Sequence, residues 1–238
     1  MLMVVPLVFT VVLPTVFILI IGLVPGDLGD LQTLLDMLPV GKQQDTMARN
    51  VIALIMNNIV PVFFIMIPIM AASVTAASSF VGEKEKKTLE TLLYGPLPLN
   101  RIFQAKVWAS FLLSMIVSVS SFIIMLIVVE TEVLLVTGSM LIPDINWLVV
   151  LLIVSPAVSI LAITLIVGGS AKSQTVEESQ QRAVFLILPV LLLILGQFTG
   201  ILLINALYML GLGAIFAVIA FIMMKRAARK FTYEALLR

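Results

Sequence analysis

The stretch VIALIMNNIVPVFFIMIPIMAASVTAASSFVG (Val51–Gly82) contains 32 consecutive residues without a charged side chain. A helix needs about 20 apolar residues to cross the hydrocarbon core of a bilayer, so this stretch is long enough to span it. It ends at GEKEKKTLE (Gly82–Glu90), where six of nine residues are charged. The two stretches together predict a membrane-spanning helix that stops at a charged segment beside the membrane surface.

The composition of the whole chain extends this prediction. Of its 238 residues, 61% are hydrophobic and only 11% are charged, and the mean hydropathy is +1.21. Soluble domains carry roughly 25% charged residues. The apolar runs do not alternate with polar residues, as the strands of a membrane β-barrel would. The expected fold class is therefore all-α, a polytopic membrane protein.

Six spans account for the apolar runs. The last uncharged run, Ala183–Met224, has 42 residues and needs two spans with a tight turn between them. No linker or internal repeat divides the chain, so we expect one transmembrane domain over residues 1–238. The predicted spans cover residues 3–24, 52–80, 107–129, 146–169, 183–203 and 206–224.

The positions of Lys and Arg predict the orientation in the membrane. Twelve of the 14 basic residues fall in three segments, 83–106, 172–182 and 225–238, and the other two are Lys42 and Arg49. Because basic residues concentrate in cytoplasmic loops, both termini are predicted to be cytoplasmic, in a multi-pass protein of the plasma membrane. The net charge of +1 implies no nucleic-acid partner, because the basic residues are confined to a few short loops. Membrane lipid is the expected surrounding of the spans.

Several kinds of chemistry are excluded by residue type. The chain has no cysteine and no histidine, so disulfides, zinc sites and Ser-His or Cys-His catalysis are not expected. GEKEKKT lacks the second glycine that a phosphate-binding P-loop requires. EESQQR (Glu177–Arg182) matches a pattern of intramembrane proteases, but those enzymes also require histidines. We predict no catalytic residue, no metal site and no cofactor in this chain.

The charged segment has helical spacing. Glu83 with Lys87, and Lys86 with Glu90, are spaced to form i,i+4 ion pairs. Leucines follow on one face, and Pro96 ends the pattern. The sequence thus predicts a short amphipathic helix over residues 83–94 at the cytoplasmic surface. It is either a stop-transfer cluster or a contact for a protein partner, and its glutamates favour the partner, because topology depends mainly on basic residues.

The longer stretch SFVGEKEKKTLETLLYGPLPLNRIFQAKVW (Ser79–Trp108) resembles the signature of type-2 ABC transporter permeases, the type V exporters, and in particular the NatB-like exporters. The six-span plan and the ending ARKFTYEALLR (Ala228–Arg238) agree with this resemblance. The group usually has a basic amphipathic helix before the first span, whereas this sequence starts inside that span.

The resemblance implies the permease domain of an ABC exporter, with the 83–94 segment as its coupling helix. The implied partners are two copies of a separate ABC ATPase subunit, which bind ATP and Mg²⁺, and a second permease chain in a homodimer or heterodimer. Lys106 would anchor the third span at the membrane interface. The residues expected to contact the ATPase are Glu83, Lys84, Glu85, Lys87, Thr88 and Glu90, with a second, smaller contact through Glu177 and Glu178.

Uncharged polar residues within the spans are candidates for a transport path. Ser114, Ser118 and Ser121 share one helix face, and other polar residues lie in the second and fifth spans. The alternative is that they form hydrogen bonds between helices. Prolines at 61, 68, 156 and 189 are expected to loosen their helices. The complete candidate path set is Asn57, Asn58, Ser114, Ser118, Ser121, Gln197 and Thr199.

The cargo is open at this stage. A sodium ion, a small amphiphilic drug and a hydrophobic peptide all fit an exporter of this kind. The NatB-like signature favours sodium transport, whereas the absence of an acidic residue within any predicted span argues against it. The rival function, from a different class, is a non-transporting membrane scaffold or sensor that binds a cytoplasmic partner through the same helix.

Overall fold

The structure is a computed structural model and consists of helices throughout the part that it describes, as the sequence predicts. The described residues are 8, 11–12, 14–16, 18–19, 52–53, 55–88, 98–138, 140, 143–170, 173–181, 184–198 and 206–230.

The second span is a chain of short helices rather than one regular helix. It begins with the π-helical turn η2 (Ile55–Ile59) and continues through α4 (Val60–Phe64), α5 (Met66–Phe80) and α6 (Gly82–Glu85). Pro61 follows η2 by two residues, and Pro68 lies three residues after the turn at Ile65. Because proline cannot donate a backbone hydrogen bond, the predicted loosening occurs at these two positions.

The third span is one uninterrupted helix, α8 (Leu99–Thr137), of 39 residues. At 1.5 Å per residue it is about 58 Å long, nearly twice the thickness of a bilayer core. The predicted span, 107–129, covers only its middle. The sequence prediction ended at Glu130 because a carboxylate is unfavourable in hydrocarbon, but the helix continues beyond that residue and ends at Gly138, which has a left-handed φ of 68°.

The helices after α8 lie where the sequence predicts the fourth, fifth and sixth spans. The fourth consists of α9 (Ile145–Val149), the π-helical turn η3 (Val150–Val154) and α10 (Ser155–Ser170), and here Pro156 follows the π turn just as Pro61 does. The short helix α11 (Val176–Gln181) leads to α12 (Val184–Phe198), which contains Pro189. The last described helix is α13 (Ala206–Lys230).

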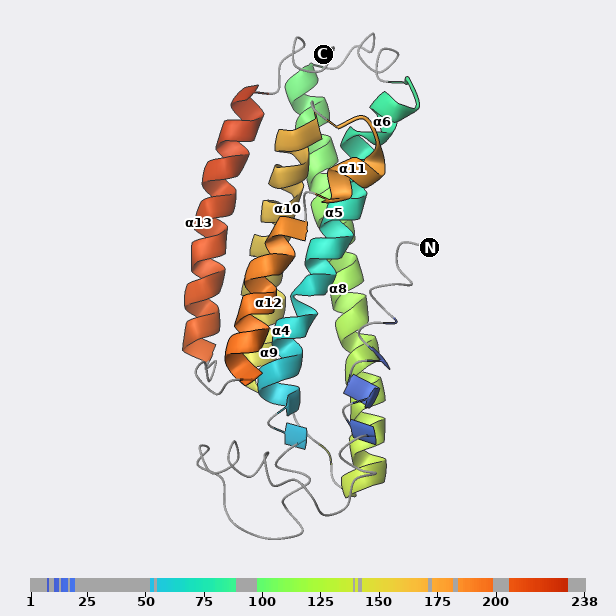
Figure 1. Cartoon of the computed structure of the whole chain (residues 1–238), viewed down its shortest axis with the longest axis vertical. Helices are drawn as coiled ribbons and strands as arrows, with labels where there is room; N and C mark the ends of the chain where they lie inside the picture. The colour runs from blue at the N-terminus through green and yellow to red at the C-terminus, as the bar shows by residue number, and fades with distance from the viewer. Residues whose placement is uncertain are drawn as a thin grey trace.

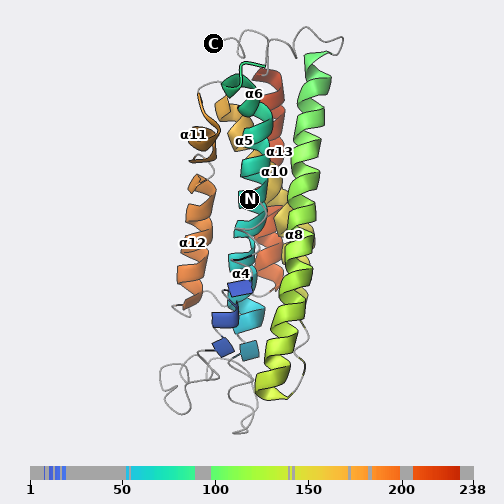
Figure 2. The ribbon, with the colours of Figure 1, turned by 90° about the vertical axis from the view of Figure 1, so that its right-hand side faces the viewer.

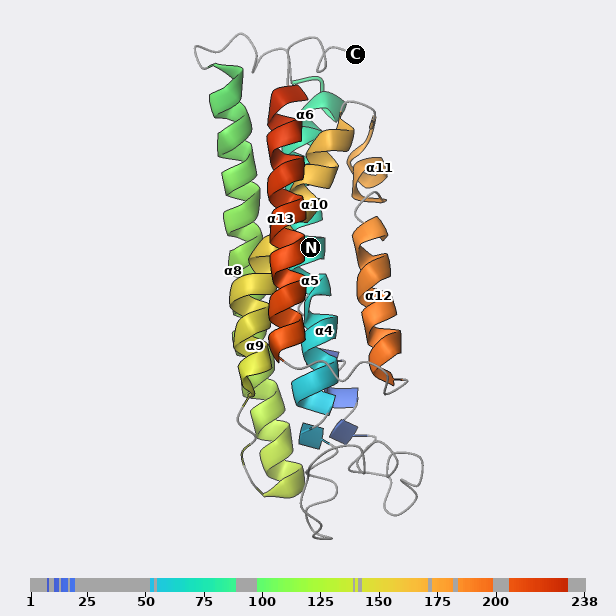
Figure 3. The same cartoon turned by 90° about the vertical axis from the view of Figure 1, so that its left-hand side faces the viewer.

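Helices α5 and α10 form the centre of the bundle. α10 packs against α5, α8 and α13, and α5 packs against α8, α10 and α11 (Figures 1 and 3). Burial follows this arrangement. In an apolar stretch of 18 residues taken from each span, 72% of the residues are buried in the second span and 67% in the fourth, against 33% in the third and 17% in the sixth. α8 and α13 thus leave most of their apolar surface for lipid or for another protein chain.

Four helical segments of the described part are long and apolar enough to cross a membrane: Ile55–Glu85, Arg101–Leu135, Ile145–Ser170 and Leu207–Ala227. They correspond to the predicted second, third, fourth and sixth spans. The fifth prediction, 183–203, is represented by the 15 described residues of α12. In the first, 3–24, the few described residues are helical, and Oγ1 of Thr15 lies 2.7 Å from Oε1 of Glu132.

The two ends of the bundle differ in charge. One end carries α6, α11, the first turns of α8 and the last turns of α13 (Figure 1). We call it the basic end, because the described Lys and Arg side chains all belong to these elements or to the turn after α6. They are Lys84, Lys86, Lys87, Arg101, Lys106, Lys225 and Arg226. The opposite end, called the far end, carries η2, α9 and the last turns of α8.

Candidate functional site

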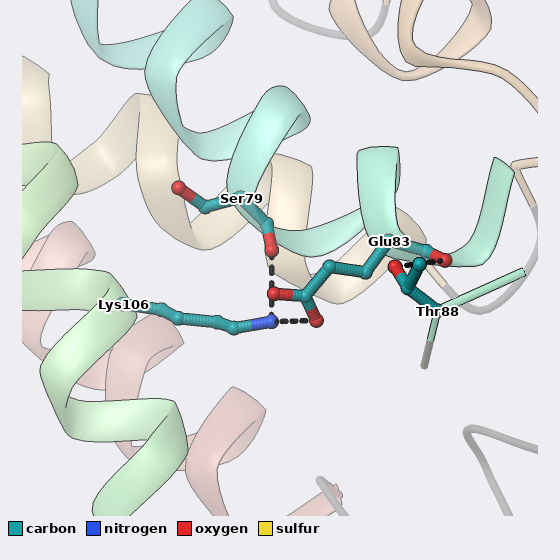
Figure 4. Close-up of polar contacts among 4 residues, drawn as sticks. All are labelled: Ser79, Glu83, Thr88 and Lys106. Atoms are coloured by element: carbon teal, nitrogen blue, oxygen red, sulfur yellow. Dashed lines mark hydrogen bonds and ion pairs between the residues drawn. The ribbon is translucent and has the colours of Figure 1, made fainter. Parts of the chain in front are cut away.

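Lys106 connects the second and third spans at the basic end. Its Nζ donates a hydrogen bond to the carbonyl oxygen of Ser79 at 2.9 Å and forms an ion pair with Glu83 (Figure 4). The same ammonium lies 5.5 Å from the ring centroid of Phe80. Both side chains of the ion pair are partly buried, with 15% of Lys106 and 28% of Glu83 exposed. A positive charge at the last carbonyls of α5 also complements the dipole of that helix.

The charged helix ends sooner than the sequence predicts. The N–H of Thr88 donates to the carbonyl of Glu83, and the N–H of Lys87 donates to that of Lys84, at 2.9 and 3.1 Å. These two bonds, with a left-handed φ of 56° at Lys87, form a Schellman motif, which terminates a helix. The prediction of one continuous helix over residues 83–94 is therefore wrong at Lys87.

The same turn changes the partner of Glu83. A left-handed residue interrupts the i,i+4 geometry on which the predicted Glu83–Lys87 pair depends, and Glu83 pairs with Lys106 on α8 instead. Lys86, Lys87 and Thr88 are exposed at the tip of the turn. Residues 89–97, including the predicted contact Glu90, lie outside the described residues.

Glu85 connects α6 to the loop between the fourth and fifth spans. Its Oε2 accepts a hydrogen bond of 3.0 Å from the N–H of Val176, the first residue of α11. A carboxylate at this position satisfies a free N–H and complements the helix dipole. Thr175 caps the same helix, since its Oγ1 accepts from the N–H of Glu178 at 3.2 Å, while Glu178 accepts from the N–H of Gln174 at 2.8 Å.

These contacts join three elements that are distant in sequence. Glu83 and Glu85, two residues apart on α6, hold the start of α8 and the start of α11 respectively. The predicted ATPase-contact residues therefore separate into two groups. Glu83 and Glu85 contact other elements of the chain, and Glu85 is exposed as well. Lys87, Thr88, Glu177 and Glu178 are exposed, and the hydrogen bonds of Thr88 and Glu178 stay within their own turns. Lys84 is half-buried.

The serine face of α8 is packed inside the bundle. Ser114, Ser118 and Ser121 are completely buried, and so is the neighbouring Ser110, on the side of α8 that meets α5 and α10. Ser114 donates to the carbonyl of Phe111, and Ser118 to that of Ser114, both at 2.8 Å. Both bonds stay within α8, so they are not the hydrogen bonds between helices that the alternative predicts. The buried small side chains instead let the helices approach closely, which favours a role in packing over a path lining.

Asn57 lies at the far end and links two spans. Its Oδ1 accepts from the N–H of Asp144 at 3.2 Å, and its carbonyl accepts from Nδ2 of Asn146 at 3.2 Å. Asn58 lies beside it in η2 and is half-buried. Of the two path candidates in the fifth span, Gln197 is in α12 and nothing is described of its side chain, and Thr199 lies outside the described residues.

Proline explains why these carbonyls are available. In a continuous helix, the carbonyls of Met56 and Asn57 would accept hydrogen bonds from N–H groups four or five residues later in the chain. Pro61 stands at that spacing from both carbonyls and has no N–H. Nε1 of Trp147 donates to the Met56 carbonyl at 3.0 Å, and Asn146 takes that of Asn57. Sequence analysis missed both donors, although Pro61 was the available signal that unpaired carbonyls would need partners.

The described residues contain no group of three or more Cys, His, Asp or Glu side chains that could hold a metal ion. The arrangement at the basic end is one of charge pairs and helix caps between spans.

The fold defines a polytopic helical membrane protein in which the charged turn after the second span contacts both the third span and the loop before the fifth. Residues 4–194 match the ABC-2 type transporter family, and the chain belongs to this family. It is therefore the membrane-spanning permease subunit of an ABC transporter, not the catalytic one, and the family implies pairing with an ABC ATPase subunit. No curated protein and no solved structure shows a significant match to the chain.

Proposed function

We propose that this permease exports a small amphiphilic molecule and is driven by two ATPase subunits that dock at the basic end. Membership of the ABC-2 type transporter family supports the pairing with an ATPase. The clustering of the described basic side chains at one end supports a cytoplasmic position for that end, where the ATPase would be. A second permease chain, identical or related, completes the proposed assembly.

The observation that carries this proposal is the pair of contacts made by α6. Glu83 holds Lys106 of α8, and Glu85 holds the N–H of Val176 in α11. A force applied to α6 would be passed directly to α5, of which it is the continuation, and through these contacts to the third span and to the loop before the fifth. Three parts of the bundle would move together.

The proposed docking surface is the exposed tip of the turn after α6. Lys86, Lys87 and Thr88 are exposed, and the two lysines, which form no ion pair with another described side chain, fit an acidic groove on the ATPase. Glu178 extends this surface from α11. In this scheme Glu83 and Lys106 transmit movement but do not contact the ATPase.

The test separates docking from transmission. Lys86→Glu is expected to weaken ATPase binding by about tenfold through charge reversal at an exposed site, with no change in thermal stability. Lys106→Met is expected to leave binding within about twofold and to abolish the stimulation of ATP turnover by cargo. Co-purification and ATP turnover of the reconstituted complex measure the two effects.

Lys225→Glu is the matched control, because Lys225 is an exposed basic residue at the same end but on α13. It should change neither quantity. Normal ATPase binding and normal stimulation in both Lys86→Glu and Lys106→Met would contradict the coupling scheme. An ATPase that binds but whose turnover responds to no cargo would instead support the scaffold or sensor alternative.

A further inference from the structure

A cleft of about 350 Å³ opens between α5, α11 and α12. Figure 2 shows α11 and α12 on the same side of α5. The volume lies in the range of pockets that bind small molecules, about 300–1,000 Å³. The described residues that line it are Ile69, Met70, Ser73, Val74, Glu177, Gln180, Gln181 and Ile187.

One wall of the cleft is mainly apolar, with Ser73 as the polar side chain among its described residues. α5 contributes Ile69, Met70 and Val74, and α12 contributes Ile187. Val74 is eight residues before Gly82, where α6 begins, which places it about 12 Å into the second span from the charged turn. The cleft therefore reaches from the basic end toward the middle of the span. At that depth the apolar part of a ligand would be shielded from water.

The opposite rim is polar and acidic. Glu177, Gln180 and Gln181 all come from α11, which lies along α5 instead of projecting away from the bundle (Figure 1). The Glu85 contact and the Thr175 cap hold α11 in this position. Glu177 is the one ionisable residue among the described lining residues, and it forms no ion pair with another described side chain.

We infer that this cleft binds a small amphiphilic cation, with its apolar part against α5 and α12 and its positive charge at Glu177. Glu177 is exposed at the rim, so its carboxylate attracts the cation with the modest strength of a surface charge pair, and burial of the ligand's apolar part against α5 and α12 adds to that attraction. The identification of this ligand as transported cargo rests on the proposed export function, whereas binding to the cleft does not.

The experiment compares two probe ions of the same shape and opposite charge, tetraphenylphosphonium and tetraphenylborate. Binding is measured by equilibrium dialysis with the full chain in nanodiscs of zwitterionic lipid, and empty nanodiscs give the lipid background. We expect saturable binding of the phosphonium that Glu177→Gln weakens by about tenfold, while borate binding stays the same or becomes stronger.

Glu178→Gln is the charge control, since Glu178 is the next residue of α11 but does not line the cleft, and it should leave phosphonium binding within twofold of the unchanged chain. A second pair of variants tests the location. Ile187→Trp fills the cleft and should abolish binding of both ions, whereas Leu188→Trp changes a neighbouring side chain that is 52% exposed and outside the lining set, and should not.

Equal effects of Glu177→Gln and Glu178→Gln, or unchanged binding in Ile187→Trp, would overturn the assignment. The dialysis needs no ATPase, so its failure is distinct from failure of the export function. If the phosphonium binds as expected but never stimulates ATP turnover in the assembled complex, the cleft assignment stands and the export proposal falls. If cargo stimulates ATP turnover normally while Glu177→Gln has no effect on phosphonium binding, the export proposal stands and the cleft assignment falls.

Discussion

The second span is attached to its neighbours at both ends, and the two attachments use different chemistry. At the basic end, ionised side chains make the contacts: Lys106 with Glu83, and Glu85 with the N–H of Val176. At the far end, neutral donors on the fourth span, Asn146 and Trp147, bind carbonyls that η2 and Pro61 leave free.

This difference in chemistry indicates which end of the second span can move relative to the neighbouring helices. Contacts between partly exposed charges are weakened by salt and can be redirected by a partner's charges. Trp147 is only 3% exposed, and its ring packs at 5.6 Å from that of Phe64 and 5.5 Å from that of Phe122. We therefore expect the far end to be the fixed point of the second span and the basic end to be the part that moves.

The largest effect is expected from breaking the far end. Trp147→Ala removes a buried aromatic ring and should lower the free energy of unfolding by about 3–5 kcal/mol. Trp147→Phe keeps a ring but leaves the Met56 carbonyl without its donor, at a cost of about 1–3 kcal/mol. Thermal unfolding of the purified chain in detergent, followed by size-exclusion chromatography, measures both. If the Trp147→Ala chain were as stable as the original chain, the far end could not be the fixed point of the second span.

The next effect tests the close packing of α13 on η3 near the far end. A Cβ at Gly213 would lie 2.9 Å from Cγ2 of Ile153 and 3.3 Å from Cγ2 of Val154, whereas at Gly211 nothing lies within 4 Å. Gly213→Ala should cost about 1–3 kcal/mol, because the helices must separate. Gly211→Ala should be neutral or stabilising by up to about 1 kcal/mol through helix propensity. The same thermal assay compares them, and equal shifts would contradict this packing.

A smaller effect is expected at the basic end. A double-mutant cycle with Glu83→Gln and Lys106→Gln should give a coupling energy of about 1 kcal/mol, between the values for exposed and buried pairs. Raising the salt concentration from 0.1 to 1 M should reduce it, because the Debye length falls to about 3 Å. The Trp147→Phe effect should not depend on salt. A salt-independent coupling at Glu83 would remove the distinction between the two ends.

The smallest effect is expected at Lys87, whose left-handed φ of 56° is unfavourable for a residue with a Cβ. Lys87→Gly should stabilise the turn by about 0.5–1 kcal/mol, since glycine adopts this conformation without strain. Lys86→Gly is the control and should be neutral or destabilising, because Lys86 has right-handed helical angles. Hydrogen exchange of the Thr88 amide measures the local change, and faster exchange in Lys87→Gly would contradict the strain argument.

Much of the fold was predictable because hydropathy acts locally. The uncharged run Val51–Gly82 identified the second span, and the prolines marked where it would be irregular, with Pro61 and Pro156 each following a π turn. The length of α8 was not predictable in this way. Glu130 and Glu132 lie on a helix that continues past the apolar window, because backbone hydrogen bonding does not stop where hydrophobicity does.

The charged segment was located correctly but described wrongly in detail. Periodicity favoured the Glu83–Lys87 pair along one helix, whereas Glu83 pairs with Lys106, 23 positions away. A pattern within a segment reveals which residues are compatible with a helix, but it contains no information on a competing partner in another span. For the same reason the path interpretation of the α8 serines could not be weighed against packing before their burial was known.

The sequence by itself determined that this chain lies in a membrane, approximately where it crosses, and which end carries the basic residues, because these depend on composition along short windows. The tertiary structure decided which residues meet. Glu177 belongs to a loop in sequence, and it lines an apolar cleft beside the second span because α11 packs against α5, with Glu85 bonded to its first residue. Contacts between distant segments depend on how helices pack, and no window of the sequence contains both partners.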